Sequence, residues 1–385
     1  MADVGVRQAG SLLAHRIWRE SMNRRNLFGA ALALFAAIGL VGCKDDKAGS
    51  EQAAAKTAET FHWKMVTSWP KNFPGLGTAA ERLAERINAM SAGRLTVKVY
   101  AAGELVPALE VFDAVSRGTA EMGHGTPYYW KGKVPAAQFF SSVPFGFSTL
   151  EMNAWLSHGG GQALWDETYA PYGVKPLSAG NTTMQMGGWF NKEINSLADI
   201  KGLKIRMPGL GGEVWSKLGA ITVNLPGGEI FTSLQTGAID ATDWVGPYND
   251  LAFGLHKAAK YYYFPGWQEP QAVVESMVNQ KAFDALPADL QAIVVEAARA
   301  ATLDMMNDYV FNNAKALQSL KSEGVQFKRL PDEVLQAMRE QSGVVLESLA
   351  AENDLNGRIW ASQKAFLEEA SAMQSLTEKE LYNWR

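Results

Sequence analysis

The chain has a single cysteine, Cys43, and only five histidines, so few residues are available for covalent or metal chemistry. One cysteine cannot form a disulfide within the chain or a cysteine-rich metal site, and the histidines lack the spacing of a zinc motif. There is also no G-x-S-x-G nucleophile elbow and no H-E-x-x-H helix motif. These absences argue against a serine hydrolase of that type and against a zinc enzyme.

Excess positive charge is lacking as well. The sequence contains 36 Lys and Arg against 40 Asp and Glu, which gives a formal net charge of -4 with no basic stripe. This balance argues against a nucleic-acid partner and against strong binding to an anionic membrane surface. The length of 385 residues exceeds what one hydrophobic core usually covers, so we expect two domains.

Residues 1–43 have the pattern of an export signal that ends in a lipobox. Arg24-Arg25 precede an apolar run over 27–41, which is short for a spanning helix of about 20 residues. The run leads into Leu-Val-Gly-Cys, so we expect Cys43 to receive lipid and to become the mature N-terminus. The arginine pair resembles a twin-arginine signal, with general secretion as the alternative, and the true start is either Met1 or Met22.

Residues 44–60 are polar, rich in alanine and without periodicity, which is typical of a flexible tether. The globular body begins at Phe61 and is expected outside the cytoplasm, in the periplasm. The stretch 61–69 is predicted to be a strand, followed by a helix, a second strand and a second helix. This β-α-β-α order indicates an α/β fold, and the chain from Phe283 onward is predicted to be helical.

An internal similarity links residues 110–129 with residues 229–248. Each copy predicts a helix, a glycine cap, a short strand and then a polar or aromatic tip. Because ligands of open α/β sheets lie beyond the carboxyl ends of strands, two such units would direct both tips to one cleft, chance similarity being the alternative. His124 and Asp243 occupy equivalent tips, and for His124 we favour a structural role.

Arg206 lies near the end of a predicted strand over 203–207, with apolar neighbours on both sides. It either pairs with a surface acid or offers a guanidinium fork to a small carboxylate. The glycine-rich run that follows is not a dinucleotide fingerprint, because Val214 stands in the position of the third glycine. We expect this run to turn into a helix.

Several segments together resemble a known family over the body from about residue 61 to the end. They are "GLKIRMPG", "QMGGWF", "GGEIFTSLQTGAIDATDWVGPY" and "YYYFPGW". They resemble the extracytoplasmic substrate-binding proteins of TRAP (tripartite ATP-independent periplasmic) transporters, in the branch for 2-oxo acids or lactate. The resemblance implies an α/β two-lobe periplasmic binding-protein fold with a cleft between the lobes and long C-terminal helices. The expected lobes are 61–184 plus 272–312, and 185–271 plus 313–385.

The resemblance also implies roles for single residues. Arg206 would bind the substrate carboxylate, and Gln185 would contact both substrate and cation. Asp243 and the Trp244 carbonyl would complete a cation site together with Glu269, where some relatives have Gln. The cation is therefore expected to be Ca²⁺ or Na⁺. Weaker candidates for polar or aromatic contacts with the substrate are Tyr128, Tyr129 and Asn181.

The implied function is that of a lipid-anchored periplasmic solute-binding protein, not an enzyme. It would capture a small monocarboxylate, a 2-oxo acid such as pyruvate or else lactate, and deliver it to a TRAP membrane permease. A homodimer through the C-terminal helices is implied, with Ile359, Trp360 and Phe366 as candidate contacts. Two alternatives stay open: a metal-assisted extracytoplasmic lyase or isomerase acting on a small carboxylic acid, and a ligand-sensing protein for a receptor.

Overall fold

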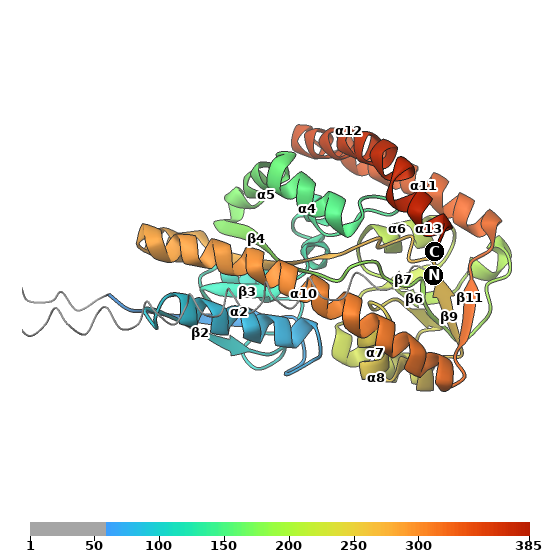
Figure 1. Cartoon of the computed structure of the whole chain (residues 1–385). Coiled ribbons are helices and arrows are strands. Elements are labelled where there is room, and N and C mark those ends of the chain that lie inside the picture. Colours follow the sequence, from blue (N-terminus) through green and yellow to red (C-terminus); the bar gives the residue numbers. More distant parts are fainter. Residues whose placement is uncertain (1–58) are drawn as a thin grey trace, which may run out of the picture. The chain divides into compact units, whose positions relative to one another are not determined.

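The computed structural model describes residues 59–385, so the predicted signal, the predicted lipidation at Cys43 and most of the predicted tether over 44–60 lie outside the described residues. The described chain contains two β-sheets that are surrounded by helices, as Figure 1 shows. The predicted α/β class with two lobes and long C-terminal helices is confirmed. In the part that the structure describes, no helix is both long enough and apolar enough to cross a membrane.

The first sheet has the strand order β2-β1-β3-β10-β4, with β1 parallel to both β2 and β3, and β10 antiparallel to both β3 and β4. Helices cover both of its faces, so successive residues such as Met65 and Val66 are both buried, in different clusters. The strands are β1 (Phe61–Thr67), β2 (Leu95–Tyr100), β3 (Met122–Gly125), β4 (Val174–Asn181) and β10 (Val273–Asn279).

The second sheet has the order β11-β9-β5-β8-β6-β7. Its strands β8, β6 and β7 run parallel, whereas β5 is antiparallel to both β8 and β9. The strands are β5 (Gly188–Phe190), β6 (Lys204–Arg206), β7 (Ile221–Val223), β8 (Ala241–Thr242), β9 (Tyr261–Phe264) and β11 (Gln326–Arg329).

Helices connect and cover these strands. The shorter ones are α2 (Leu76–Met90), α3 (Val111–Ser116), α4 (Thr149–His158), α5 (Gly161–Tyr169), α6 (Gly209–Lys217), α7 (Gly227–Gln235), α8 (Pro247–Phe253), α9 (Gln280–Asp284) and α13 (Glu378–Asn383). The longer ones are α10 (Ala288–Ser322), α11 (Asp332–Ala350) and α12 (Asp354–Leu376). The glycine-rich run after β6 forms α6, as predicted.

The chain crosses between the sheets in two segments that lie side by side. After β4 it enters the second sheet through residues 182–187, and after β9 it returns through 265–272. The Thr182 N–H donates to the Ala272 carbonyl over 3.0 Å, and the Gln185 N–H donates to the Glu269 carbonyl over 3.2 Å. Helix α10, 35 residues long, packs against β4 and α2 of one part and α8 of the other (Figure 1). The lobe boundaries themselves stay a prediction.

Both copies of the internal similarity fold as a helix followed by a strand. Helix α3 ends before Gly118 (φ 73°) and α7 before Gly237 (φ 75°), left-handed conformations that glycine adopts at no steric cost. Strands β3 and β8 follow, and both are interior strands of their sheets. Each tip therefore begins at the end of an interior strand of its sheet.

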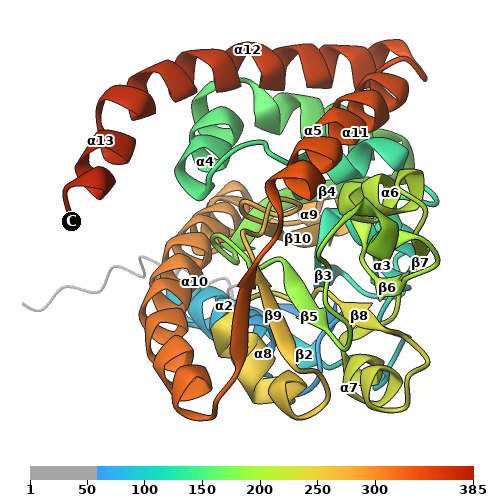
Figure 2. The ribbon, with the colours of Figure 1, turned by 90° about the vertical axis from the view of Figure 1, so that its right-hand side faces the viewer.

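Two expectations for the C-terminal part were wrong. The chain after Phe283 is not helical throughout, because β11 pairs in parallel with the edge strand β9. Ile359 is not available as a dimer contact, because it is fully buried within its own chain. Trp360 is partly buried and stacks on Phe139 with ring centroids 6.3 Å apart. Phe366 is partly buried and meets Phe147 edge to face, so the dimer contacts at Trp360 and Phe366 stay a prediction. Figure 2 shows α12 and α13 extending beyond this contact region.

Candidate functional site

The two tips enclose a small cavity between the sheets. Its walls include Trp69 after β1, Tyr128 and Tyr129 after β3, and Trp244 after β8. The crossing segments add Thr182 and Gln185. The cavity is only ≈ 10 Å³, about the space of one water molecule, so binding of a larger ligand requires the tips to separate and then close.

Arg206 ends β6 and is 1% exposed. Its guanidinium donates to the Asp243 carbonyl (2.7 Å), the Leu225 carbonyl (3.2 Å) and the Tyr129 hydroxyl (3.3 Å). It also lies 5.3 Å from the Trp244 ring centroid, within range of a cation–π contact. A guanidinium has five N–H donors, so two remain available for a bound carboxylate.

Two buried acids face this arginine. Asp243 follows β8 and Glu269 lies on the returning segment, and both are nearly inaccessible to solvent. The Asp243 carboxylate is 3.9 Å from the guanidinium and accepts one hydrogen bond, from Gln268 Nε2 over 3.0 Å. Burial raises the pKa of Asp243 even though Arg206 opposes the shift. Burial, with the charge of Asp243 added, raises the pKa of Glu269 well above its usual range.

Several oxygen atoms here lack a hydrogen-bond partner. Gln185 turns its amide N–H groups toward Glu269 (2.7 Å) and Thr182 (3.0 Å), which leaves its Oε1 without a donor. Asp243 Oδ2 and Gln268 Oε1 are also buried and unpaired. Unsatisfied buried acceptors are costly, and a set of oxygen ligands suits a hard cation such as Ca²⁺ or Na⁺. The residues present therefore fit the cation that the sequence resemblance implies.

The remaining candidates lie in different settings. Tyr128 donates toward Glu269 over a long 3.5 Å contact. Asn181 is buried at the end of β4, but its side chain is bonded to Gln271 (2.6 Å) and to the Thr183 N–H (2.9 Å), so its role in binding stays a prediction. The structure therefore brings Arg206, Gln185, Asp243, Trp244, Glu269, Tyr128 and Tyr129 together around or beside the cavity, with Asn181 directed elsewhere.

Two residues that sequence reasoning did not assign to the site contribute to it. Gln268 donates to both Asp243 and the Met186 carbonyl, and the absence of a side chain at Gly211 makes room for it. Trp69 forms a wall of the cavity, and its Nε1–H donates to His124 Nδ1 over 2.8 Å. His124 is fully buried, and burial lowers its pKa to about 3, so it acts as a neutral support for Trp69.

A more spacious cavity lies elsewhere. It is an open groove of ≈ 590 Å³ between α4, β4 and α10, with an apolar lining that includes Leu156, Leu303 and Met306. It has no buried acid and no buried cation among its lining residues. The buried charged groups that can recognise a small anion lie instead beside the smaller cavity, where Arg206 contacts Tyr129 and Glu269 contacts Gln185.

Comparison with known proteins agrees with this geometry. Residues 65–353 match the DctP family, described as bacterial extracellular solute-binding protein, family 7. The chain is 42% identical over 363 residues to the monocarboxylate 2-oxoacid-binding periplasmic protein of Nostoc sp., an alignment that covers 94% of this chain and 99% of that protein.

Two solved structures are similar across nearly their whole length. A TRAP periplasmic solute binding protein from Pseudoalteromonas atlantica, with bound sodium and pyruvate, has a TM-score of 0.83 and 42% identity, and the match covers 84% of this chain and 99% of that chain. One from Colwellia psychrerythraea, with bound calcium and pyruvate, has a TM-score of 0.83 and 41% identity, with coverage of 85% and 100%. The chain belongs to bacterial extracellular solute-binding protein family 7, the DctP family of TRAP periplasmic solute-binding proteins.

Proposed function

We propose that the protein captures a small monocarboxylate, a 2-oxo acid such as pyruvate or else lactate, and passes it to a TRAP permease. The observation that carries this proposal is the buried Arg206 guanidinium, which keeps two donors free beside a closed cavity. A carboxylate is the group that matches a fork of parallel N–H donors. The aromatic walls from Trp69 and Trp244 exclude water and favour a short ligand.

A cation is the second part of the proposal. When bound, it supplies positive charge and accepts the carboxylate and keto or hydroxyl oxygens of the ligand. Gln185 Oε1, Asp243 Oδ2, the Trp244 carbonyl and the Glu269 carboxylate would hold it. Once ionised, Asp243 and Glu269 together with a bound monocarboxylate would carry three negative charges against the single charge of Arg206. A divalent ion neutralises the difference, so Ca²⁺ is preferred over Na⁺.

Calorimetry against 2-oxo and 2-hydroxy acids of increasing length tests the proposal. After exhaustive chelation, pyruvate should bind weakly or not at all, and added Ca²⁺ should restore binding better than Na⁺. Asp243→Asn should blunt this restoration because it removes a charged ligand. Unchanged pyruvate affinity after both chelation and Asp243→Asn would exclude the cation from binding.

Arginine variants test the carboxylate site separately. Arg206→Ala should weaken pyruvate binding by two to three orders of magnitude, about 3–4 kcal/mol. Arg206→Lys should also bind poorly, because an ammonium cannot make two parallel hydrogen bonds. Arg358→Lys, at an exposed position on α12, is the matched control. Near-native affinity in either Arg206 variant would place the carboxylate elsewhere.

We also propose that the protein is a binder and not a lyase or isomerase. Incubation of pyruvate or lactate with the protein should give stoichiometric uptake and no product, whereas turnover would favour the enzyme. Delivery to a permease, rather than signalling to a receptor, is supported by membership of the TRAP family. The proposal further includes lipid attachment at Cys43 and a homodimer through the C-terminal region.

A further inference from the structure

A third buried acid, Asp250 on α8, lies next to the site without being one of its proposed ligands. It is 1% exposed, and the side-chain and backbone donors to it within residues 59–385 are all uncharged. Its Oδ2 accepts hydrogen bonds from Trp189 Nε1 (2.9 Å) and from the Tyr262 hydroxyl (2.6 Å). Its Oδ1 accepts from the Val245 N–H over 3.1 Å. Neutral donors thus satisfy this carboxylate and direct one of its oxygens at the loop after β8.

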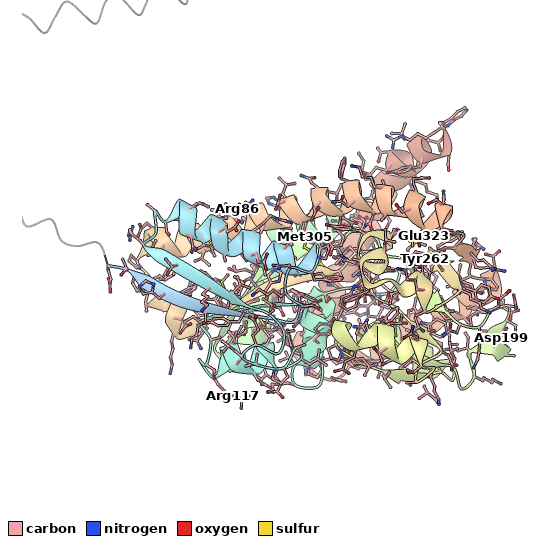
Figure 3. All side chains as sticks on the ribbon, turned by 90° about the horizontal axis from the view of Figure 1, so that it is seen from below. Arg86, Arg117, Asp199, Tyr262, Met305 and Glu323 are labelled. Atoms are coloured by element: carbon pink, nitrogen blue, oxygen red, sulfur yellow. The ribbon has the colours of Figure 1, made fainter. Side chains whose placement is uncertain are left out.

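The donors that hold Asp250 are themselves rigid. Trp189 on β5 and Tyr262 on β9 are fully buried neighbours in the second sheet. Their rings are stacked, with centroids 4.0 Å apart and an interplanar angle of 13°. Tyr262 is labelled in Figure 3, where it lies among the packed side chains of the interior. Two stacked rings on paired strands leave the Asp250 carboxylate little freedom to move.

The Val245 N–H and the Trp244 carbonyl belong to the same peptide unit. Among the described residues the cis peptide bond is Phe264–Pro265, so the Trp244–Val245 bond is trans and its C=O points opposite to its N–H. Asp250 therefore holds the Trp244 carbonyl oxygen on the side away from itself. No hydrogen bond to that oxygen is found within residues 59–385. A buried carbonyl without a donor is available to a ligand.

We propose that Asp250, held by Trp189 and Tyr262, is a positioning residue. It orients the Trp244 carbonyl oxygen toward the cation that would also bind the substrate carboxylate. The inference rests on the proposed function and adds to it a support that lies outside the ligand set. Partners that orient ligands in this way typically change metal affinity 10- to 100-fold when they are removed.

The hydrogen-bond chemistry explains why an acid is needed at this position. An ionised carboxylate only accepts, and here it faces three donors from Trp189, Tyr262 and Val245. An asparagine of the same shape has one acceptor oxygen and one NH₂ group. Whichever way the amide turned, its NH₂ would meet the N–H of either Val245 or Trp189. Asp250→Asn should therefore release the loop, whereas Tyr262→Phe removes one donor and keeps the ring stack.

Calcium titration by calorimetry tests the inference. We expect Asp250→Asn to weaken Ca²⁺ binding at least tenfold and Tyr262→Phe to weaken it by a smaller factor. Pyruvate affinity at limiting Ca²⁺ should fall in the same order and should recover in part at saturating Ca²⁺. Tyr169→Phe is the matched control, because it removes a buried hydroxyl that donates to a different carboxylate, Glu275, over 3.1 Å.

A purely structural role predicts a different pattern. It would lower the melting temperature of the Asp250 and Tyr262 variants as in Tyr169→Phe, with Ca²⁺ affinity within twofold of wild type, and that result would overturn the inference. If Asp250→Asn does not fold, Tyr262→Phe decides: weaker Ca²⁺ binding supports positioning, and unchanged binding rejects it. Failure of the wild type to bind both Ca²⁺ and pyruvate would instead reject the proposed function.

Discussion

At the scale of single residues, Glu275 shows what burial does to an acid that has no cation nearby. It lies on β10, is fully buried, and accepts hydrogen bonds from Trp130 Nε1 and the Tyr169 hydroxyl on one oxygen. Its other oxygen has no partner. Burial raises the pKa of Glu275 to about 8, although both hydrogen bonds oppose the shift. The folded protein therefore prefers the neutral carboxyl at this position.

This raised pKa predicts a pH dependence of stability. The unfolded carboxyl titrates at about 4.3, so between that pH and about 8 the folded state holds a proton that the unfolded chain has lost. The contribution of this proton to the free energy of unfolding is fully present below the unfolded pKa and is lost as the pH rises through the folded pKa. The free energy of unfolding falls by up to about 1.4 kcal/mol per pH unit over this range. Glu275→Gln should remove this pH dependence. Its free energy of unfolding should therefore increase relative to that of wild type as the pH rises.

Urea unfolding of wild type and Glu275→Gln at several pH values between 5 and 8.5 measures the difference directly. Other buried acids titrate in both proteins, so only the gap between the two curves is informative. Glu369→Gln, at an exposed position on α12, controls for the lost charge. Parallel curves for wild type and Glu275→Gln would show that Glu275 does not bind a proton differently in the folded state.

The stretch 240–250 (DATDWVGPYND), which overlaps the end of the second similar segment, shows how far residues could be assigned from the sequence. Its three acids lie in different settings: Asp240 pairs with Lys192 at the surface, Asp243 faces Arg206, and Asp250 lies behind the loop after β8. The internal similarity and the family resemblance predicted that Asp243 lies at the tip after β8, beside Arg206, and its role in binding stays a prediction. Asp250 could not be assigned, because its role depends on donors from two other strands.

At the scale of elements, periodicity and turn residues in the sequence predicted those helices, strands and turns whose formation depends on residues close by in the chain. The first strands and helices, the glycine caps at 118 and 237, and the paired tips all follow from periodicity and turn chemistry. Strand β11 was missed because only four residues form it and its partner β9 is more than sixty residues earlier in the chain. The contact of Ile359 was misassigned for the same reason, because it is fully buried within its own chain. An apolar helix face indicates burial, but it does not identify the surface that buries it.

The C-terminal helices predict where a dimer contact should be sought. The end of α12 and the residues after it expose large apolar side chains: Met373 is 62%, Leu376 80% and Trp384 82% exposed. The groove between α4, β4 and α10 is apolar and open. We expect the C-terminal tail of one copy, residues 373–384, to bury these apolar side chains on a second copy. Contact between apolar side chains and water is unfavourable, and a dimer would remove it.

A double variant, Leu376→Ser with Trp384→Ser, tests this contact. Light scattering should give the mass of two chains for wild type and a dimer at least tenfold weaker for the double variant. Glu378→Ser, between the two positions, is the matched control. A wild type that is monomeric at high concentration would reject the dimer, and a double variant that dimerises like wild type would place the interface on another surface.

At the scale of the whole molecule, the two parts are held closed by contacts that link their elements. Tyr129 bonds to Arg206, Lys131 bonds to Glu213 over 3.0 Å, and the Asn249 side chain donates to the Pro74 carbonyl over 2.7 Å. The first of these is a contact that a bound carboxylate would share. Ligand binding and closure of the two parts therefore draw on the same residues, which is the property a delivery protein requires.

Delivery to a permease takes place at a membrane, and a lipid at Cys43 would keep the protein there, which leads to the prediction for this residue. The sequence after the apolar run fits attachment of lipid to this residue, and burial of acyl chains contributes about 0.8 kcal/mol per CH₂. One chain alone is marginal, whereas several hold a protein stably. Wild type should incorporate labelled fatty acid and fractionate with membranes. Cys43→Ser should incorporate none and lose that association, and Ser50→Ala in the tether should behave like wild type. Wild type without the label, or Cys43→Ser that stays with membranes as before, would show that another feature localises the protein.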